Sequence, residues 1–453
     1  MTELLDVAQG VVDRARPGEG VEAYVARGTE TEVRAYDGRV EQLAAASSAG
    51  IGIRVVVPAP GGAGNQVGFA WAGSLERDVI DQVLADARDN AAYATPDPDV
   101  ALAEPDGAAP AEIDLWDPDF SRLSTDQKIQ LALDLERAVR HADPRIRQVD
   151  AADYADGHRE VALASTTGIR AATRRTSAFL SVSAIAGHSA ESQTGSGFSV
   201  GRAGSSLDPS EAARSAVERA VRMLGAGRAR TQRTVVVFDP RVVSTLLGVV
   251  SAALSGEAVV KGRSFFAGRV GEQVAAAGVT LVEDPTDPRA FRAAAYDGEG
   301  LACRPTRLVD AGVLSGFVYD TVSARRAGTT STGSGVRGGY SSTPAAGCRA
   351  VALAPGPLDQ EAILRSVGEG LYVQSVTGVH SGVNPVSGDF SVGAVGLLVR
   401  TGALAEPVRE LTVASTLQRM LQSVVHVGAD LAWLPGTAAG QTLAIADMQV
   451  SGA

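Results

Sequence analysis

The chain has 453 residues, which is too long for one ordinary hydrophobic core, so its length predicts two or three domains. Its formal net charge of −11 argues against nucleic acid or an anionic membrane surface as its main partner. No apolar run approaches the ~18 residues that span a bilayer, and the acidic N-terminus lacks the basic and apolar regions of a signal peptide.

Residues 1–94 predict an N-terminal α+β domain. A helix is expected over 2–15 and an amphipathic helix over 75–92, with short strand-like runs between them. Asp37 and Gly38 are typical of a hairpin turn between two of these runs. The predicted short strands cover 21–26, 32–36, 40–46, 51–57 and 66–71.

Residues 95–118 are rich in Pro, Asp and Ala and show little periodicity, which predicts a linker. Residues 119–230 predict a central α+β domain. Ser124 or Thr125 is placed to cap a helix over 126–141, and an Asp-Pro pair opens a second helix that ends near Leu224. The strands expected between these helices cover 146–155, 159–165, 169–183 and 188–200.

The C-terminal domain, predicted over 231–453, begins with an apolar strand and a helix that Asp239 is placed to cap. Its apolar residues are dense enough over 242–260 to predict one largely buried helix. The helix carries a single carboxylate, Glu257, and Lys261 is the expected partner of that carboxylate at the i+4 position. A basic, glycine-punctuated loop follows, with the sequence KGRSFFAGRVGEQ.

The rest of the C-terminal domain contains strand-like runs, a Gly-, Ser- and Thr-rich segment over 324–347, and a short helix over 360–367. Asp359 is placed to cap this helix and Gly368 to end it. Helices do not alternate strictly with strands anywhere in the chain, which argues against a doubly wound parallel sheet. We therefore expect an α+β fold of several domains, with antiparallel or mixed sheets and packed helices.

Several common kinds of active site have no support in the sequence. The Gly333-Ser334-Gly335 segment lacks the strand and the GK[ST] of a phosphate-binding loop, and no G-x-S-x-G elbow joins a strand to a helix. No two of the five histidines have the helical spacing of paired metal ligands. The two cysteines, Cys303 and Cys348, form no CxxC motif, and we expect them reduced in a cytoplasmic protein.

The best candidates for substrate binding are polar side chains in two loops. In the loop over 328–344, the hydroxyls of Thr332 and Ser334, together with Arg337 and Tyr340, could hold a peptide backbone or its carboxylate. The alternative is a flexible surface loop with an arginine there by chance. His380 lies in GVHSGVNPVSGDFS, a turn-rich polar segment beside apolar strands, where a substrate or interface role is expected.

Four segments closely resemble the TldD/PmbA family, also called TldD/TldE, and the resemblance extends over nearly the whole chain. The N-terminal run EVRAYDGRVEQLAAASSAGIGIRVVV is also similar to the first domain of that family. The four segments are GRSFFAGRVGEQV, EDPTDPRAFRAAAYDGEGLACRPTRLVDAGVLSGFVYDTVSARRAG, TGSGVRGGY and GVHSGVNPVSGDFSVGAVGLLVRTGAL.

The resemblance implies a subunit of a two-protein metallopeptidase. Catalytic members of the family carry HExxxH on the helix before the GxSxFxGxVGE-like segment, with a Cys near the C-terminus as the third zinc ligand. Counting back from the GRS of this chain places Leu247, Gly248 and Ala252 at the first His, the Glu and the second His. No Cys follows residue 348. The resemblance therefore implies no catalytic residue and no metal ligand here.

We therefore expect a TldE/PmbA-like, non-catalytic subunit of a cytoplasmic complex that cleaves unfolded or modified peptides. Its expected partners are a TldD-like paralogue with HExxxH, which would hold the zinc, and a peptide substrate; neither nucleic acid nor a membrane is expected. The alternative is a stand-alone, homodimeric peptide-binding protein or a divergent metal-independent peptidase. A purely structural assembly scaffold is a third reading.

Overall fold

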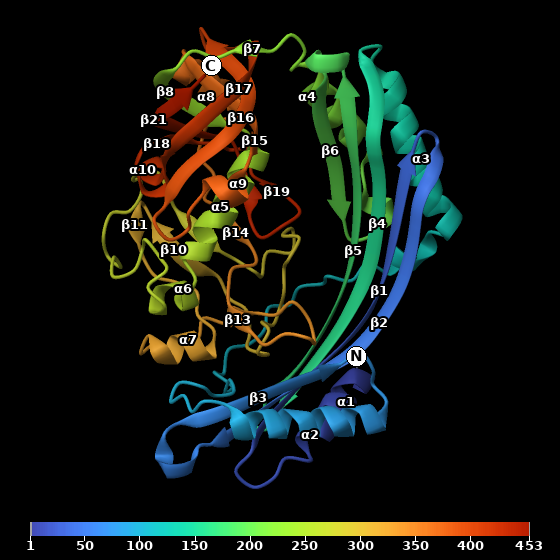
Figure 1. Cartoon of the computed structure of the whole chain (residues 1–453), viewed down its shortest axis with the longest axis vertical. Helices are drawn as coiled ribbons and strands as arrows, with labels where there is room; N and C mark the ends of the chain where they lie inside the picture. Colours follow the sequence, from blue (N-terminus) through green and yellow to red (C-terminus); the bar gives the residue numbers. More distant parts are fainter. Residues whose placement is uncertain (1, 453) are drawn as a thin grey trace.

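The structure, a computed structural model, describes residues 2–452. A long curved sheet forms one side of the molecule and a C-terminal module packs beside it (Figure 1). Helices pack against sheets that are antiparallel or mixed, which confirms the predicted multi-domain α+β class. Within residues 2–452, no helix is both long and apolar enough to cross a membrane.

The long sheet has six strands in the order β3-β2-β1-β4-β5-β6, and all neighbouring strands are antiparallel. Strands β1 to β3 come from the predicted N-terminal domain and β4 to β6 from the predicted central domain, so the two segments share one sheet. The strands are β1 (Gly20–Tyr36), β2 (Arg39–Pro58), β3 (Asn65–Ala72), β4 (Ile146–Ser165), β5 (Arg170–Ala186) and β6 (Gln193–Gly201).

Three pairs of strands predicted as short and separate are in fact single long strands, namely β1, β2 and β4. The turn-forming glycines that suggested breaks lie in continuous ladders instead. A Cβ on Gly28 would lie 2.4 Å from the His158 carbonyl oxygen, and one on Gly157 would lie 2.8 Å from that of Thr29. These glycines therefore permit close approach of neighbouring strands. The Asp37 and Gly38 turn is confirmed, with φ of 50° and 72° between the paired β1 and β2.

Four helices cover this sheet (Figure 1). α1 and α2 pack on the end near β3, and α3 and α4 pack near the other end. The predicted cap of α3 is confirmed, because Ser124 and Gln127 form a capping box. The helices are α1 (Thr2–Val12), α2 (Arg77–Tyr93), α3 (Thr125–Ala142) and α4 (Pro209–Val221), with short 3₁₀ turns η1 (Pro60–Gly62), η2 (Pro118–Arg122), η3 (Ser189–Glu191) and η4 (Gly204–Ser206).

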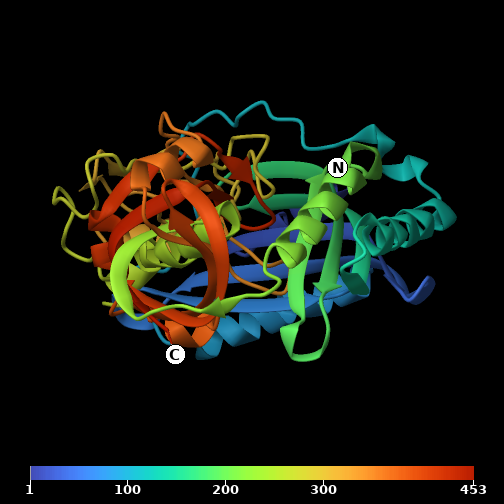
Figure 2. The same cartoon turned by 90° about the horizontal axis from the view of Figure 1, so that it is seen from above.

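The C-terminal module is built on a seven-stranded mixed sheet in the order β18-β21-β8-β15-β16-β17-β7. Because β21 pairs with both β8 and β17, the strands β21, β8, β15, β16 and β17 close into a ring. Figure 2 shows its later strands, β15, β16, β17 and β21, in orange and red. The strands are β7 (Gly227–Arg228), β8 (Gln232–Phe238), β15 (Gly370–Thr377), β16 (Asp389–Arg400), β17 (Ala403–Thr416), β18 (Val424–Val427) and β21 (Leu443–Ser451).

Helix α5 (Pro240–Ala253) packs against this ring, and its apolar side chains belong to the largest core of the molecule. Asp239 caps it as predicted, by accepting a hydrogen bond from the backbone N–H of Arg241. The prediction of one helix over 242–260 was wrong, because the chain becomes extended at Ser255 before α6 (Gly256–Val260). Backbone hydrogen bonds to Val318 on both sides of Ser255 replace the helical ones.

Smaller elements connect the ring to the rest of the module. The capped helix α8 is confirmed, with Asp359 accepting from Ala362 N–H and Gly368 at φ 69°. The helices are α7 (Thr321–Arg326), α8 (Gln360–Val367), α9 (Val379–Gly382) and α10 (Leu417–Gln422), and the strands are β9 (Leu281–Glu283), β10 (Thr306–Asp310), β11 (Val313–Leu314), β12 (Gly335–Val336), β13 (Ala345–Ala346), β14 (Val351–Leu353), β19 (Ala432–Trp433) and β20 (Ala439–Gly440).

Candidate functional site

A cavity of about 510 Å³, here called the α5 cavity, opens beside the helix that the sequence predicts to have lost its metal ligands. Gly248 and Ala252 line it, one turn apart on α5, whereas Leu247 is buried in the hydrophobic core. Positions 247 and 252 lie ~140° apart on a regular helix, so they do not face the same space. The other lining residues are Ser251, Ser255, Glu257, Ala258, Lys261, Arg263, Ala346, Gly347, Cys348 and Thr437.

The α5 cavity contains few groups that can do chemistry. Glu257 forms an ion pair with Lys261, which confirms the partner predicted from the helical spacing. Burial, together with the neighbouring Glu283 carboxyl, raises the pKa of the Cys348 thiol well above its ordinary value. The thiol is therefore protonated at neutral pH and is a poor nucleophile.

The loop over 328–344 is folded back onto the molecule and is not a free surface loop. Thr332 Oγ1 accepts from the backbone N–H of Tyr319 at 2.8 Å and donates to the hydroxyl of Ser334 at 2.9 Å. Ser334 is only 4% exposed. These two hydroxyls therefore hold the shape of the loop.

Arg337 and Tyr340 dock the same loop onto the long sheet. Arg337 is buried, forms an ion pair with Glu22 of β1, and donates from Nε to the Gly298 carbonyl at 2.6 Å. Tyr340 lies over β2, against Gly50 and Gly52, and its ring centroid is 6.1 Å from that of Trp71 on β3. The two side chains predicted to hold peptide thus join the C-terminal module to the sheet.

A buried charge network continues from this contact. Arg54 of β2 donates from Nε to Glu22 at 2.9 Å and approaches Glu299 to 3.8 Å. Burial opposes ionisation of Glu22, but Arg337 and Arg54 together hold the pKa of that carboxyl below its ordinary value. Burial, with Asp297 nearby, raises the pKa of Glu299 to about 7 against the attraction of Arg54. The network therefore contains one firmly ionised acid and one that titrates near neutrality.

His380 lies elsewhere, in the single-turn helix α9 that packs on β16. It is exposed, and no hydrogen bond or ion pair among the described residues connects it with the loop over 328–344. The structure thus brings together four of the five predicted substrate-binding residues and places the fifth on the ring of the C-terminal module.

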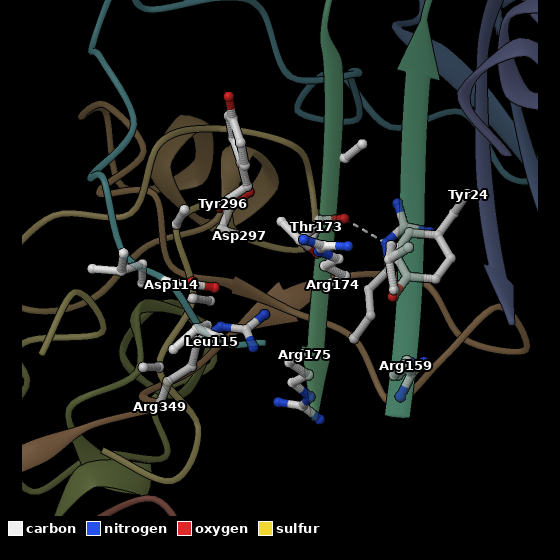
Figure 3. A pocket seen from close by; sticks show the side chains of 18 residues that line it. Tyr24, Asp114, Leu115, Arg159, Thr173, Arg174, Arg175, Tyr296, Asp297 and Arg349 are labelled. Carbon is white, nitrogen blue, oxygen red and sulfur yellow. Dashed lines mark hydrogen bonds between the residues drawn. The ribbon is translucent and has the colours of Figure 1, made fainter. Parts of the chain in front are cut away.

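A second cavity, of about 280 Å³, lies between the long sheet and the C-terminal module (Figure 3). We call it the arginine cavity, because five of its lining residues are arginines. Tyr24, Val161 and Leu115 supply apolar walls. The arginines are Arg159, Arg174, Arg175, Arg337 and Arg349.

Three models of PmbA/TldA metallopeptidase domains match the chain: domain 1 over residues 21–91, the central domain over 118–224 and the C-terminal domain over 231–452. The chain belongs to the PmbA/TldD family. Metalloprotease PmbA of Escherichia coli O157:H7 is 27% identical to it, over 99% of this chain and 94% of that protein. A TldD homologue of Haemophilus influenzae is also 27% identical, over 67% of this chain and 65% of its own.

The fold of this chain matches that of a solved relative. The crystal structure of TldE from Thermococcus kodakarensis superimposes with a TM-score of 0.89, at 22% identity and with full coverage of both chains. Within this PmbA/TldD fold, zinc does not fit the side chains of the α5 cavity. The cavity offers one thiol and one carboxylate that is tied to a lysine, fewer than the three protein ligands of a zinc site, and residues 2–452 contain no cluster of three His, Cys, Asp or Glu that could hold a metal.

Sequence reasoning missed the arginine cavity and the buried network. Glu22 offered a signal, because it is a charged residue inside the apolar run VEAYV at the start of β1. The adjacent Arg174 and Arg175 inside a predicted strand were a second signal. Neither signal identifies its partners, since these lie on other strands and in the C-terminal module; Arg54 and Arg337 are 32 and 315 residues from Glu22.

Proposed function

We propose that this chain is the TldE/PmbA-like, non-catalytic subunit of a heteromeric metallopeptidase that degrades unfolded or modified peptides in the cytoplasm. The α5 cavity carries the proposal: Gly248 and Ala252 line it where the family resemblance expects the general base and a zinc ligand. The catalytic zinc and the base would belong to an HExxxH-bearing TldD-type partner. The relative named PmbA aligns with nearly the whole chain, whereas the TldD homologue aligns with two thirds of it.

The chemistry of the α5 cavity supports a non-catalytic role. Hydrolysis of a peptide bond needs an activated water or nucleophile and stabilisation of the oxyanion that forms. Glu257 is neutralised by Lys261, and the Cys348 thiol stays protonated. The free cysteines, of which Cys303 is buried, agree with the proposed cytoplasmic location.

An open strand edge supports a protein partner. Strand β2 pairs with β3 only from Ile51 onward, so within the described chain its first half has no strand on its outer side. Residues 39–48 are exposed throughout, with Val40 and Leu43 left 39% and 47% exposed. A long unpaired edge with apolar side chains is an association surface.

The test combines co-purification with metal analysis. The chain would be purified alone and after co-expression with an HExxxH paralogue from the same genome, and zinc and cleavage of an unfolded peptide would be measured for both. We expect a stable complex, with zinc and cleavage present only when the paralogue and its HExxxH glutamate are intact. Stoichiometric zinc together with peptide cleavage by the lone chain would overturn the proposal.

The strand edge allows a matched control. Leu43→Lys places a charge on the open part of β2, and Val425→Lys places one on β18, where the side chain is equally exposed at 47%. We expect Leu43→Lys to weaken the complex and Val425→Lys to leave it intact. Equal effects would argue against β2 as the contact.

The alternative, a homodimeric peptide-binding protein or a divergent metal-independent peptidase, is favoured by the arginine cavity, which this chain forms without a partner. It predicts a homodimer at micromolar concentration and peptide binding or cleavage without any paralogue. A monomer that binds its paralogue and cleaves nothing alone would exclude it.

A further inference from the structure

The arginine cavity carries more positive charge than the ion pairs among residues 2–452 balance. Arg337 is neutralised by Glu22, but no ion pair is formed by the other four arginines within residues 2–452. Arg159 makes only long contacts, of 3.4 and 3.5 Å, to the Gly338 carbonyl. The Nε of Arg349 is buried without a hydrogen-bond partner. Arg159, Arg175 and Arg349 are half-buried, and Arg174 is exposed. Partly desolvated positive groups without counter-charges are costly, so the cavity is suited to receive an anion.

The two acids that line the cavity do not provide the missing charge. Asp297 accepts backbone N–H bonds from Glu299, Leu301 and Gly335, at 2.8, 3.0 and 2.8 Å, and burial raises its pKa. Asp114 is exposed at the rim. Burial, followed by the neighbouring Arg159, Arg349 and Arg202, lowers the pKa of Arg175 to about 10, which leaves it protonated at neutral pH.

The arginines converge from both sides of the cavity. Figure 3 shows Arg159 on β4 and Arg174 and Arg175 on β5, with Arg349 projecting toward them from the C-terminal module. Arg174 lies over the ring of Trp116, 4.8 Å from its centroid, which fixes one guanidinium at the linker. Planar guanidinium groups arranged in this way match the two oxygens of a carboxylate.

An open strand edge borders the same cavity. Strand β5 pairs with β6 only from Ala178 onward, and before that point its outer side bonds the linker through Thr176 N–H and the Leu115 carbonyl. Backbone groups on one side of a strand alternate by residue, so the N–H and C=O of Ala172 and Arg174 also point outward. Both residues line the cavity. An extended peptide can hydrogen-bond to such an edge.

We propose that the arginine cavity binds the free carboxyl terminus of an extended peptide, which adds to the β5 edge at Ala172 and Arg174 and places its carboxylate among Arg159, Arg175 and Arg349. The apolar walls at Tyr24 and Val161 would receive the last side chain. This inference rests on the proposed function only in taking peptides as the substrate. It gives the non-catalytic subunit a direct role in holding the substrate.

Binding to the lone chain tests the proposal. The probe is an N-terminally fluorescein-labelled, unstructured hexapeptide ending in leucine, prepared as the free acid and as the C-terminal amide. In fluorescence anisotropy we expect the free acid to bind at least about tenfold more tightly than the amide, because the amide lacks the charge. Equal affinities for the two peptides would overturn the proposal.

Variants of the chain locate the effect. Arg175→Gln and, separately, Arg349→Gln are expected to weaken binding of the free acid about tenfold and to remove its advantage over the amide. Arg233→Gln is the control, because Arg233 is 54% exposed and pairs with Asp447 far from the cavity. If Arg175→Gln and Arg349→Gln both leave the acid preference unchanged, the arginine cavity is not the site.

Inorganic phosphate separates a general oxyanion site from a peptide site. Millimolar phosphate should compete with the free-acid peptide, because it uses the same guanidinium groups. Phosphate that binds while neither peptide does would overturn the peptide assignment. The peptide-binding assay needs neither partner nor zinc. A failure of peptide binding can therefore be distinguished from a failure of the co-purification experiment, which tests the proposed function.

Discussion

Glu22 lies at the contact between the long sheet and the C-terminal module, where it forms ion pairs with arginines from both sides. It is 1% exposed and is the counter-charge for both Arg54 and Arg337. Glu22→Gln would leave two buried guanidinium groups without a full negative charge. Breaking a buried ion pair from one side costs about 3–5 kcal/mol, which is a large part of a typical unfolding free energy of about 5–15 kcal/mol.

Urea unfolding, followed by circular dichroism, measures this loss as a lower midpoint. Asp153→Asn is the control on the same sheet, because Asp153 pairs with Arg34 where both side chains are partly exposed, at 29% and 46%. We expect the control to lose less than about 1 kcal/mol. A loss below about 1 kcal/mol for Glu22→Gln as well would refute the reasoning that this network is desolvated and paired.

Three further predictions concern single positions. The pKa of Glu299 is raised to about 7 in the folded state, from an ordinary 4.5. The stability that the protonated carboxyl of Glu299 contributes is therefore complete below pH 4.5 and is lost as pH rises through 7. Glu299→Gln should raise the unfolding free energy at pH 8 by up to about 3 kcal/mol relative to wild type. Asp239→Ala should lower the unfolding free energy by about 3 kcal/mol or more, and Asp359→Ala by about 1 kcal/mol. Both residues cap helices, but only Asp239 also pairs with a buried arginine, Arg219. Gly28→Ala should destabilise by about 2 kcal/mol, because its Cβ would meet a backbone oxygen, whereas Gly10→Ala in α1, with open space around it, should stabilise by up to about 1 kcal/mol.

Each of these results can contradict its premise. Wild-type and Glu299→Gln proteins with the same difference in stability at pH 5 and pH 8 would show that Glu299 does not titrate there. Equal losses for the two cap variants would show that Asp239 acts only as a cap. A stable Gly28→Ala protein would mean that β1 and β4 can separate locally at low cost.

Features decided by a few neighbouring residues were predictable from the sequence. The helix cap at Ser124, the hairpin turn at Asp37 and Gly38, and the ion pair of Glu257 with Lys261 all depend on spacings of four residues or fewer. The α+β class followed from the order of the elements, and the family followed from several longer segments. For the cap, the turn and the ion pair, the interacting groups lie within one short stretch of chain.

Strand continuity, the break between α5 and α6, and the pairing of the arginines depend on distant segments, so only the tertiary structure decided them. The sequence around Gly28 predicts a turn, but in the structure this glycine permits the close approach of β4. The sequence around Ser255 predicts a helix, but backbone hydrogen bonds to Val318 interrupt it. Arg337 resembles a peptide-binding side chain in sequence, but Glu22 on another strand neutralises it. The sequence by itself determined the local elements, the family and the absence of a HExxxH motif. Which arginines are paired and which converge on a cavity is set by strand register and module packing, because a charge has no fixed role until its neighbours in space are known.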